Sequence, residues 1–169
     1  MRYHKIQKDD CLNGDGIRVS LFVSGCDFCC KGCQNPQTWD INSGKPFTEN
    51  TLKVLINELN HDYVQGLTLL GGEPLHQNNL ETINMIIDNI HSKNFAKNKD
   101  IWIYSGYTFE EIMKNDILKE TIFKCDVLVD GRYVEELKDQ NYHWAGSTNQ
   151  RVIDIKKTLL LGEISLWNN

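Results

Sequence analysis

The stretch IRVSLFVSGCDFCCKGC, Ile17 to Cys33, joins two patterns that decide the fold. Its first half alternates apolar and polar residues and contains β-branched side chains, which predicts a β-strand over 17–24. Its second half is a loop that holds four of the six cysteines in the chain: Cys26, Cys29, Cys30 and Cys33. A strand that runs straight into such a loop indicates that chemistry-bearing groups gather at one end of a sheet.

The rest of the chain repeats the order of strand, turn and helix. Thr48 is expected to cap a helix, and Thr108 to cap another with Glu111 at capping-box spacing. Periodicity predicts further strands at 66–70, 100–106 and 125–131, and helices at 48–60, 79–94 and 108–116. The tail, 149–167, has no clear period and is expected to end in a short strand or edge segment.

Strands that alternate with helices predict an α/β fold with a mostly parallel sheet. At 169 residues the chain is expected to form a single domain, 1–169, with a core of its own. A complete eight-fold β/α barrel takes about 250 residues. We therefore expect a partial, open (β/α) barrel whose reactive groups lie at the carboxyl ends of the strands.

Composition excludes several classes of function. A formal net charge of −5 leaves no basic surplus for binding nucleic acid. The chain has neither an apolar leader at its start nor an apolar run of about 18 residues, so a cytoplasmic location without membrane contact is expected. The five histidines show no ligand spacing, and surface or capping roles are expected for each.

The crowded cysteines admit three interpretations. A disulfide framework is disfavoured because Cys29 and Cys30 are adjacent and thiols stay reduced in the cytoplasm. Two abutting C-x-x-C pairs could bind zinc, although structural zinc sites usually draw their pairs from separate knuckles. The spacing Cys26-x3-Cys30-x2-Cys33 could instead bind three irons of a [4Fe–4S] cluster, leaving one iron open. Cys29 is then a bystander, and buried or half-buried thiols are expected at Cys11 and Cys125.

The C-x3-C-x2-C spacing after a first strand, with GGEP after the second, resembles the radical S-adenosylmethionine (AdoMet) superfamily. Within that superfamily the chain is similar to the activating proteins of anaerobic ribonucleoside-triphosphate reductase, from Tyr3 to Trp167. The likeness is carried by NGDGIRVSLFVSGC, CxxCxNPxTW, SGKPFT, GGEPLH, YSGYT, DVLVDGRY and GSTNQRVID. One departure is Cys29, which fills a variable position inside the motif and favours misligation or oxidation.

The resemblance implies a cofactor set and a reaction. Cys26, Cys30 and Cys33 would bind one [4Fe–4S] cluster, and the amino and carboxylate groups of AdoMet would chelate the fourth iron. A low-potential donor, which the sequence does not identify, would supply one electron that cleaves AdoMet to methionine and a 5′-deoxyadenosyl radical. That radical would take a hydrogen atom from a glycine in the large subunit of the anaerobic ribonucleoside-triphosphate reductase.

The resemblance also suggests which residues contact AdoMet. Gly71 and Gly72 have no Cβ to block backbone carbonyls from the ammonium group, and Glu73 could add a carboxylate there. Backbone contacts to the adenine are expected from Gly32, Cys33 and Gln34. Ser105, just past the third strand, is expected to contact the carboxylate or the ribose. Further candidates for carboxylate, ribose or partner contacts are Asp130, Asn149 and Arg151.

Other interpretations remain open at this point. Trp39 could be a core residue, which we expect, or a wall of the cysteine site. The same chemistry could serve another glycyl radical enzyme of the pyruvate formate-lyase type, or a small molecule. A zinc-stapled binding module without turnover is the alternative from a different class.

Overall fold

The computed structural model describes residues 1–93 and 98–167. Every predicted strand is present, although the boundaries shift by one or two residues. The described part contains these helices and strands: β1 (Arg2–Asp10), β2 (Arg18–Val23), β3 (Lys45–Pro46), α1 (Glu49–Leu59), β4 (Gly66–Gly71), α2 (Gln77–His91), β5 (Asp100–Tyr104), α3 (Phe109–Ile112), α4 (Asp116–Ile122), β6 (Val127–Asp130), β7 (Arg151–Asp154) and α5 (Ile155–Leu161).

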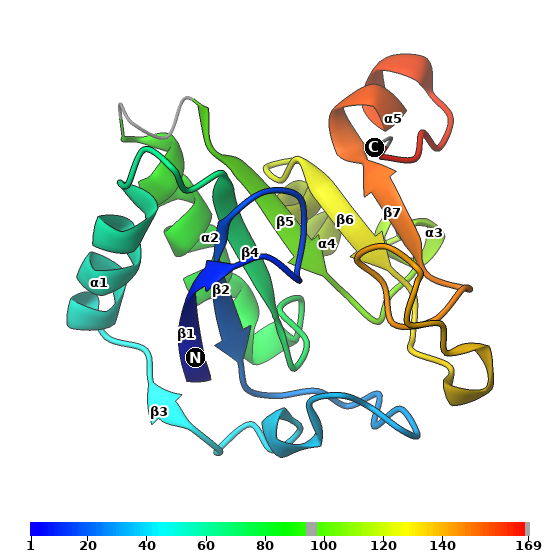
Figure 1. Ribbon diagram of the computed structural model, residues 1–169, viewed down its shortest axis with the longest axis horizontal. Helices are drawn as coiled ribbons and strands as arrows, with labels where there is room; N and C mark the ends of the chain where they lie inside the picture. The colour runs from blue at the N-terminus through cyan, green and yellow to red at the C-terminus, as the bar shows by residue number, and fades with distance from the viewer. Residues whose placement is uncertain (94–97, 168–169) are drawn as a thin grey trace.

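The strands form one seven-stranded sheet in the order β3-β1-β2-β4-β5-β6-β7. Its four central strands, β2, β4, β5 and β6, pair in parallel, whereas β1, β3 and β7 pair antiparallel at the two edges. The mostly parallel sheet is therefore confirmed for its centre. The loops that follow β2, β4, β5 and β6 emerge at the same edge of the sheet, at the bottom of Figure 1.

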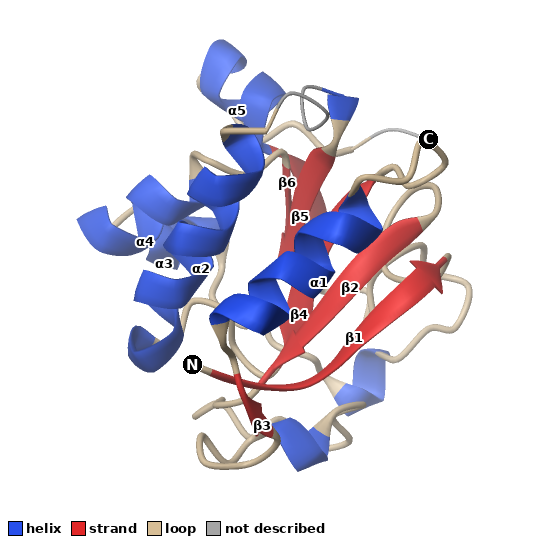
Figure 2. Cartoon of the chain, turned by 90° about the vertical axis from the view of Figure 1, so that its left-hand side faces the viewer, coloured by secondary structure: helices blue, strands red, loops and turns tan. Residues whose placement is uncertain are grey.

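One face of the sheet carries the main hydrophobic core. The alternate strand residues Val19, Leu21 and Val23 of β2 are fully buried there. Helices α1 and α2 cover this face, as Figure 2 shows, and contribute Leu55 and Ile86 to the same cluster. The predicted apolar helix faces are thus confirmed, except that Asn94, the expected end of α2, lies outside the described residues. This core fixes the strands whose ends carry the site.

The other face of the sheet is covered by loops. Trp102 of β5 is fully buried between Trp144 and Trp167, with which it makes edge-to-face contacts at centroid distances of 5.2 and 5.5 Å. Arg18 is also fully buried, and its guanidinium lies 5.1 Å from the Trp102 ring centroid. Its charge is compensated by Asp100, whose Oδ1 lies 2.5 Å from Nη2. This face is therefore closed at its centre by the packing around Trp102 and Arg18.

Some elements were not predicted. Strands β1 and β3, helix α4 and helix α5 have no counterpart in the sequence-based expectation, and the expected helix over 108–116 ends at Ile112. The tail does form an edge strand, β7, but continues into α5, and Leu166 returns to bridge Ile153. No helix within the described ranges is long and apolar enough to cross a membrane.

Candidate active site

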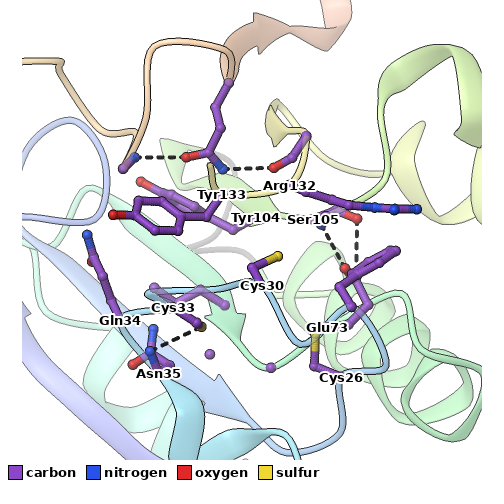
Figure 3. Close-up of a pocket in the computed structure, with 18 of the residues that line it drawn as sticks. Cys26, Cys30, Cys33, Gln34, Asn35, Glu73, Tyr104, Ser105, Arg132 and Tyr133 are labelled. Carbon is purple, nitrogen blue, oxygen red and sulfur yellow. Dashed lines mark hydrogen bonds between the residues drawn. The ribbon is translucent and has the colours of Figure 1, made fainter. Parts of the chain in front are cut away.

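A pocket at the carboxyl ends of the central strands brings the predicted residues together. We call it the cysteine pocket, because Cys26, Cys30 and Cys33 line it along with residues that follow β4 and β5. Figure 3 shows the cysteines in the middle of the pocket, with Glu73 and Ser105 on one side and Gln34 on the other. Segments that are far apart in sequence therefore meet here because parallel strands end at a common edge.

The cysteine loop is shaped by residues with positive φ. Gly25 and Gly32 have φ of 97° and 73°, and Cys29 adopts 46°, which is uncommon for a residue with a side chain. The loop is anchored at its start by hydrogen bonds from Gly25 N to Thr38 O (2.7 Å) and from Cys26 N to Trp39 O (3.0 Å). These turns direct the three motif cysteines to the pocket and leave Cys29 exposed.

The GGEP segment packs directly against the cysteine loop. Glu73 N donates to Gly25 O at 2.7 Å, and a Cβ on Gly72 would lie only 2.6 Å from that same carbonyl oxygen. Asn79, a buried residue of α2, donates from Nδ2 to Ser24 O (2.9 Å) and to Glu73 O (3.0 Å). Gly72 is thus required by close backbone approach, and Asn79, which the sequence did not single out, bridges the two loops.

Glu73 is buried and accepts three hydrogen bonds. Leu75 N and Ser105 Oγ donate to Oε1 at 2.8 and 3.0 Å, and Gly106 N donates to Oε2 at 2.8 Å. Burial raises the pKa of Glu73 to about 7, against the opposing effect of these donors. The carboxyl group therefore ties the loop after β4 to the loop after β5, and it lines the pocket beside Cys26.

The motif thiols have the protonation behaviour of half-buried cysteines without a metal. Burial raises the pKa of Cys26 to about 11 and also raises the pKa of Cys30. Within the described residues, no three ligating side chains lie close enough to hold a single metal ion. Thiolates that bind three different irons of a cluster need not converge on one point, whereas the ligands of zinc must. The donor set therefore fits a cluster better than one ion.

Arg132 is a cation that sequence reasoning missed. It lines the cysteine pocket, its guanidinium lies 4.6 Å from the ring centroid of Phe28, and its charge opposes the rise in the pKa of Cys30. Phe28 is fixed in turn by an edge-to-face contact with Tyr107 at 4.8 Å. In the described part of the chain no carboxylate pairs with Arg132. The sequence signal that could have identified Arg132 is its position in the loop that directly follows β6, two residues after Asp130.

Asp130, Asn149 and Arg151 lie outside the cysteine pocket. They line a neighbouring cavity of about 420 Å³, here called the Arg151 cavity, which also contacts Arg132. Asp130 is buried and is paired with Nε and Nη2 of Arg151, and the Nη1 and Nη2 atoms of Arg151 lie 3.0 and 2.8 Å from the Glu110 carboxylate. Asn149 Nδ2 donates to Arg132 O at 2.8 Å. The Arg151 guanidinium is therefore already satisfied within the chain.

The remaining expectations have mixed outcomes. Trp39 lines the pocket and is only half-buried, so the expected core role is wrong. The expected burial is confirmed for Cys125 and wrong for Cys11, which is exposed. His76 caps α2 by accepting from Asn78 N at 3.2 Å, as expected of a capping histidine. The cysteine pocket itself is lined by the predicted residues Cys26, Cys30, Cys33, Gln34, Gly71, Gly72, Glu73 and Ser105.

Comparison with known proteins supplies the family. Residues 12–153 match a family model described as a 4Fe-4S single cluster domain. The chain is 42% identical over 154 residues to the anaerobic ribonucleoside-triphosphate reductase-activating proteins of Salmonella typhi and Escherichia coli K12, covering 90% of this chain and 97% of theirs. The protein of the same name from Enterobacteria phage T4 is 42% identical over 152 residues, 90% of this chain and 93% of its own length.

The chain belongs to the family of anaerobic ribonucleoside-triphosphate reductase-activating proteins. The cluster-domain match begins at Leu12, before β2, and ends at Ile153 within β7. It therefore contains the whole cysteine pocket and most of the sheet that supports it. For an activating protein with a single-cluster domain, the three-cysteine loop is the part of this chain whose chemistry suits iron–sulfur ligation.

Proposed function

We propose that this chain activates an anaerobic ribonucleoside-triphosphate reductase as a radical AdoMet enzyme. The observation that carries the proposal is the direct contact between the three-cysteine loop and the GGEP segment, where Glu73 N donates to Gly25 O at 2.7 Å. This contact puts thiols for a cluster beside an open pocket with backbone and carboxylate acceptors. Family membership supports the same reaction and names the reductase of the relatives as the natural partner.

Three side chains would hold the cluster: Cys26, Cys30 and Cys33. A bound cluster and AdoMet would supply the radical chemistry: transfer of one electron would cleave the carbon–sulfur bond of AdoMet and allow removal of a hydrogen atom from a glycine of the reductase large subunit. The protein must accept that electron from a low-potential donor whose identity stays open. A thiolate-bound cluster of this kind suits a reducing compartment, which supports the cytoplasm.

The residues around the thiols would bind and orient AdoMet. Gly71 and Gly72 leave their backbone accessible, and the Glu73 carboxyl beside Cys26 provides an acceptor for the ammonium group. Gln34 and Cys33 line the pocket on the side opposite Glu73 and suit the adenosyl end, whereas Gly32 does not line the pocket and lies against the Glu135 side chain. These assignments rest on the donors and acceptors that each residue presents.

Arg132 suits the carboxylate of AdoMet better than Arg151 does. Its guanidinium is exposed at the pocket over the Phe28 ring and has no carboxylate partner among the described residues, whereas Arg151 is engaged by Asp130 and Glu110. An arginine that is free to form two parallel hydrogen bonds binds a carboxylate strongly. We therefore assign Arg132 to the cofactor, and Asp130 and Arg151 to the support of the loop behind it.

The deciding experiment is formation of a glycyl radical. Anaerobically reconstituted protein, AdoMet, dithionite and the reductase large subunit are mixed, and the radical is measured by electron paramagnetic resonance. Wild type is expected to give the glycyl signal with release of 5′-deoxyadenosine. Cys30→Ala should give neither, whereas the matched variant Cys29→Ala should give both, because Cys29 is exposed and does not line the pocket.

Two results would redirect the proposal. Normal AdoMet cleavage without a radical on this reductase would point to another glycyl radical enzyme as the target. One zinc per chain, with neither iron nor sulfide after reconstitution, would contradict the radical chemistry and favour a binding module.

A further inference from the structure

Two openings lead outward from the cysteine pocket. One is the Arg151 cavity of about 420 Å³. The other, here called the lateral groove, has about 600 Å³ and shares Asn13, Gln34, Asn35, Tyr104 and Gly146 with the cysteine pocket. The lateral groove is therefore a continuation of the site along the loop-covered face of the sheet. Its size falls within the range of roughly 300–1,000 Å³ that is typical of pockets enclosing a ligand.

The walls of the two openings differ in chemistry. The Arg151 cavity is lined by Glu110, Glu111 and Asp130, with Arg151 and Arg132 among them. The lateral groove is lined mainly by aromatic rings and by side-chain amides, including Phe22, Tyr104, Tyr142, Gln7, Asn13 and Gln140, and also contains the charged residues Lys5, Lys138 and Asp139. Amides match the donors and acceptors of a polypeptide backbone, and aromatic rings accommodate apolar side chains. The groove thus complements a peptide segment, whereas the cavity complements an ionic group.

The floor of the lateral groove contains a hydroxyl without a hydrogen-bonding partner. Tyr104 lines both the groove and the cysteine pocket, and its Oη atom is buried and unpaired among the described residues. Burial raises the pKa of Tyr104, so the group is a hydrogen-bond donor at neutral pH. Because the protein encloses this hydroxyl, Tyr104 presents its ring and not its hydroxyl to an occupant of the groove.

The rim of the groove exposes an apolar side chain. Leu12, in the turn between β1 and β2, is 78% exposed and lines the groove, and Tyr142 lines it from the segment between β6 and β7. Tyr142 is itself held by a hydrogen bond from its hydroxyl to Gln150 O at 3.2 Å. These two side chains therefore offer apolar surface at the entrance, continuous with the pocket where a substrate must react.

We propose that the lateral groove is the docking site for a glycine-bearing, extended segment of the reductase, and that Leu12 contacts this segment at the entrance. The proposal rests on the proposed function, because a glycine within another protein must reach the cysteine pocket. Glycine has no side chain to obstruct its approach to the cysteine pocket. The residues that flank it lie along the rings and amides of the groove, and the Arg151 cavity is left to small ionic groups.

The test compares two exposed leucines. Leu12→Glu places a charge at the entrance of the lateral groove, and Leu160→Glu places the same charge on α5, where Leu160 is 84% exposed and lines neither opening. For each variant, the rate of glycyl radical formation is measured against reductase concentration. The rate of glycyl radical formation is divided by that variant's own rate of AdoMet cleavage without reductase. This ratio removes any loss of activity that comes from poor folding or poor cluster loading.

Leu12→Glu is expected to raise the KM for the reductase about tenfold, because one buried leucine contact is lost and a charge is introduced. Leu160→Glu is expected to match wild type. Equal KM values for Leu12→Glu and wild type would overturn the proposal, and so would a KM defect confined to Leu160→Glu, which would place the contact on α5. A wild-type chain that cleaves AdoMet but forms no radical would instead contradict the proposed function.

Discussion

At the scale of single residues, two arginines differ in their partners: Arg151 is paired with Asp130 and Glu110, whereas Arg132 has no carboxylate partner in the described part of the chain. Arg132→Met is expected to weaken AdoMet binding by about 10- to 100-fold, the effect of removing a charge-assisted hydrogen bond of roughly 1.5–3 kcal/mol. The change in AdoMet affinity is measured by calorimetry on the reconstituted protein. Iron content should stay at the wild-type level, since Arg132 supplies no ligand.

Arg151→Met is the matched control for that prediction. It leaves the buried carboxylate of Asp130 without its cation and is expected to lower the free energy of unfolding by about 3 kcal/mol, measured by urea denaturation. AdoMet affinity should change far less than in Arg132→Met. The reverse pattern, with affinity lost at Arg151 and retained at Arg132, would contradict the assignment.

Glu73 gives the stability of the cluster-free chain a dependence on pH. Burial raises the pKa of Glu73 in the folded chain to about 7, above the ordinary value of 4.5. Between pH 4.5 and pH 7, Glu73 is therefore protonated in the folded chain and ionised in the unfolded chain. Stability from this group is therefore complete below about pH 4.5 and is lost as pH rises to about 7. The loss amounts to roughly 3 kcal/mol.

The comparison variant for this titration is Glu73→Gln, which cannot ionise. Between pH 4.5 and 7, wild type should lose stability relative to Glu73→Gln, and above about pH 8 the difference should be constant. Thermal unfolding under reducing, anaerobic conditions at several pH values measures it. A difference that is flat across the whole range would mean that the three donors to Glu73 keep its carboxylate ionised in the folded state.

Sequence reasoning located residues whose role is local and missed those whose role depends on distant partners. Cys26, Cys30 and Cys33 were singled out by their spacing together with the GGEP segment and the family resemblance, and a short loop brings the three residues to one pocket. Which arginine is free could not be found this way, because Glu110 and Arg151 are 41 positions apart and their pairing appears only in the folded chain. Asn79 was missed for the same reason.

At the scale of elements, Gly71 controls how β4 meets β2. Its φ is 106°, and a Cβ there would lie 2.8 Å from Phe22 Cα and from Val23 N, both backbone atoms of β2. Gly71→Ala is therefore expected to lower the free energy of unfolding by more than about 3 kcal/mol, since backbone strain and a backbone clash add. Urea denaturation of the cluster-free protein measures this loss.

Gly162 offers the matched glycine for this comparison. It has a similar left-handed φ of 72° at the end of α5, but a Cβ there would meet no atom within 4 Å among the described residues. Gly162→Ala should therefore cost only the conformational strain, about 1 kcal/mol. Equal losses for both variants would show that the contact between β4 and β2 adjusts to the extra carbon.

The elements that were predicted are those with a strong period or a clear cap. Helix α2 was found because Ile83, Ile86, Ile87 and Ile90 fall on one buried face. Strand β1 was missed because its sequence, RYHKIQKDD, is largely polar, and most of its side chains are only half-buried beside the edge of the sheet. Helix α5 was missed because three consecutive leucines in it are exposed: Leu159, Leu160 and Leu161. Its sequence therefore lacks the spacing of apolar residues that marks an amphipathic helix.

At the scale of the whole molecule, the fold separates what stabilises the chain from what carries out chemistry. The main hydrophobic cluster lies between the sheet and helices α1 and α2, and the motif cysteines contribute nothing to it. The cysteine loop has only the short turn Pro36–Thr38 as regular structure and is held by a few hydrogen bonds. The core was predictable from periodicity, whereas the path of this loop depends on contacts with other segments.

Removing the cluster should therefore loosen the loop without unfolding the sheet. After chelation of iron, hydrogen exchange is expected to speed up at residues 25–39 and at 132–136, where the exposed pairs of Lys31 with Glu135 and Glu136 are the main link to the loop. Exposed ion pairs of this kind contribute little to stability because solvent screens them, too little to order the loop by themselves. Amides of β4 and β5, buried under the main core, should keep their protection. The measurement is exchange mass spectrometry with and without cluster, and loss of protection throughout the sheet would show that the cluster stabilises the entire fold.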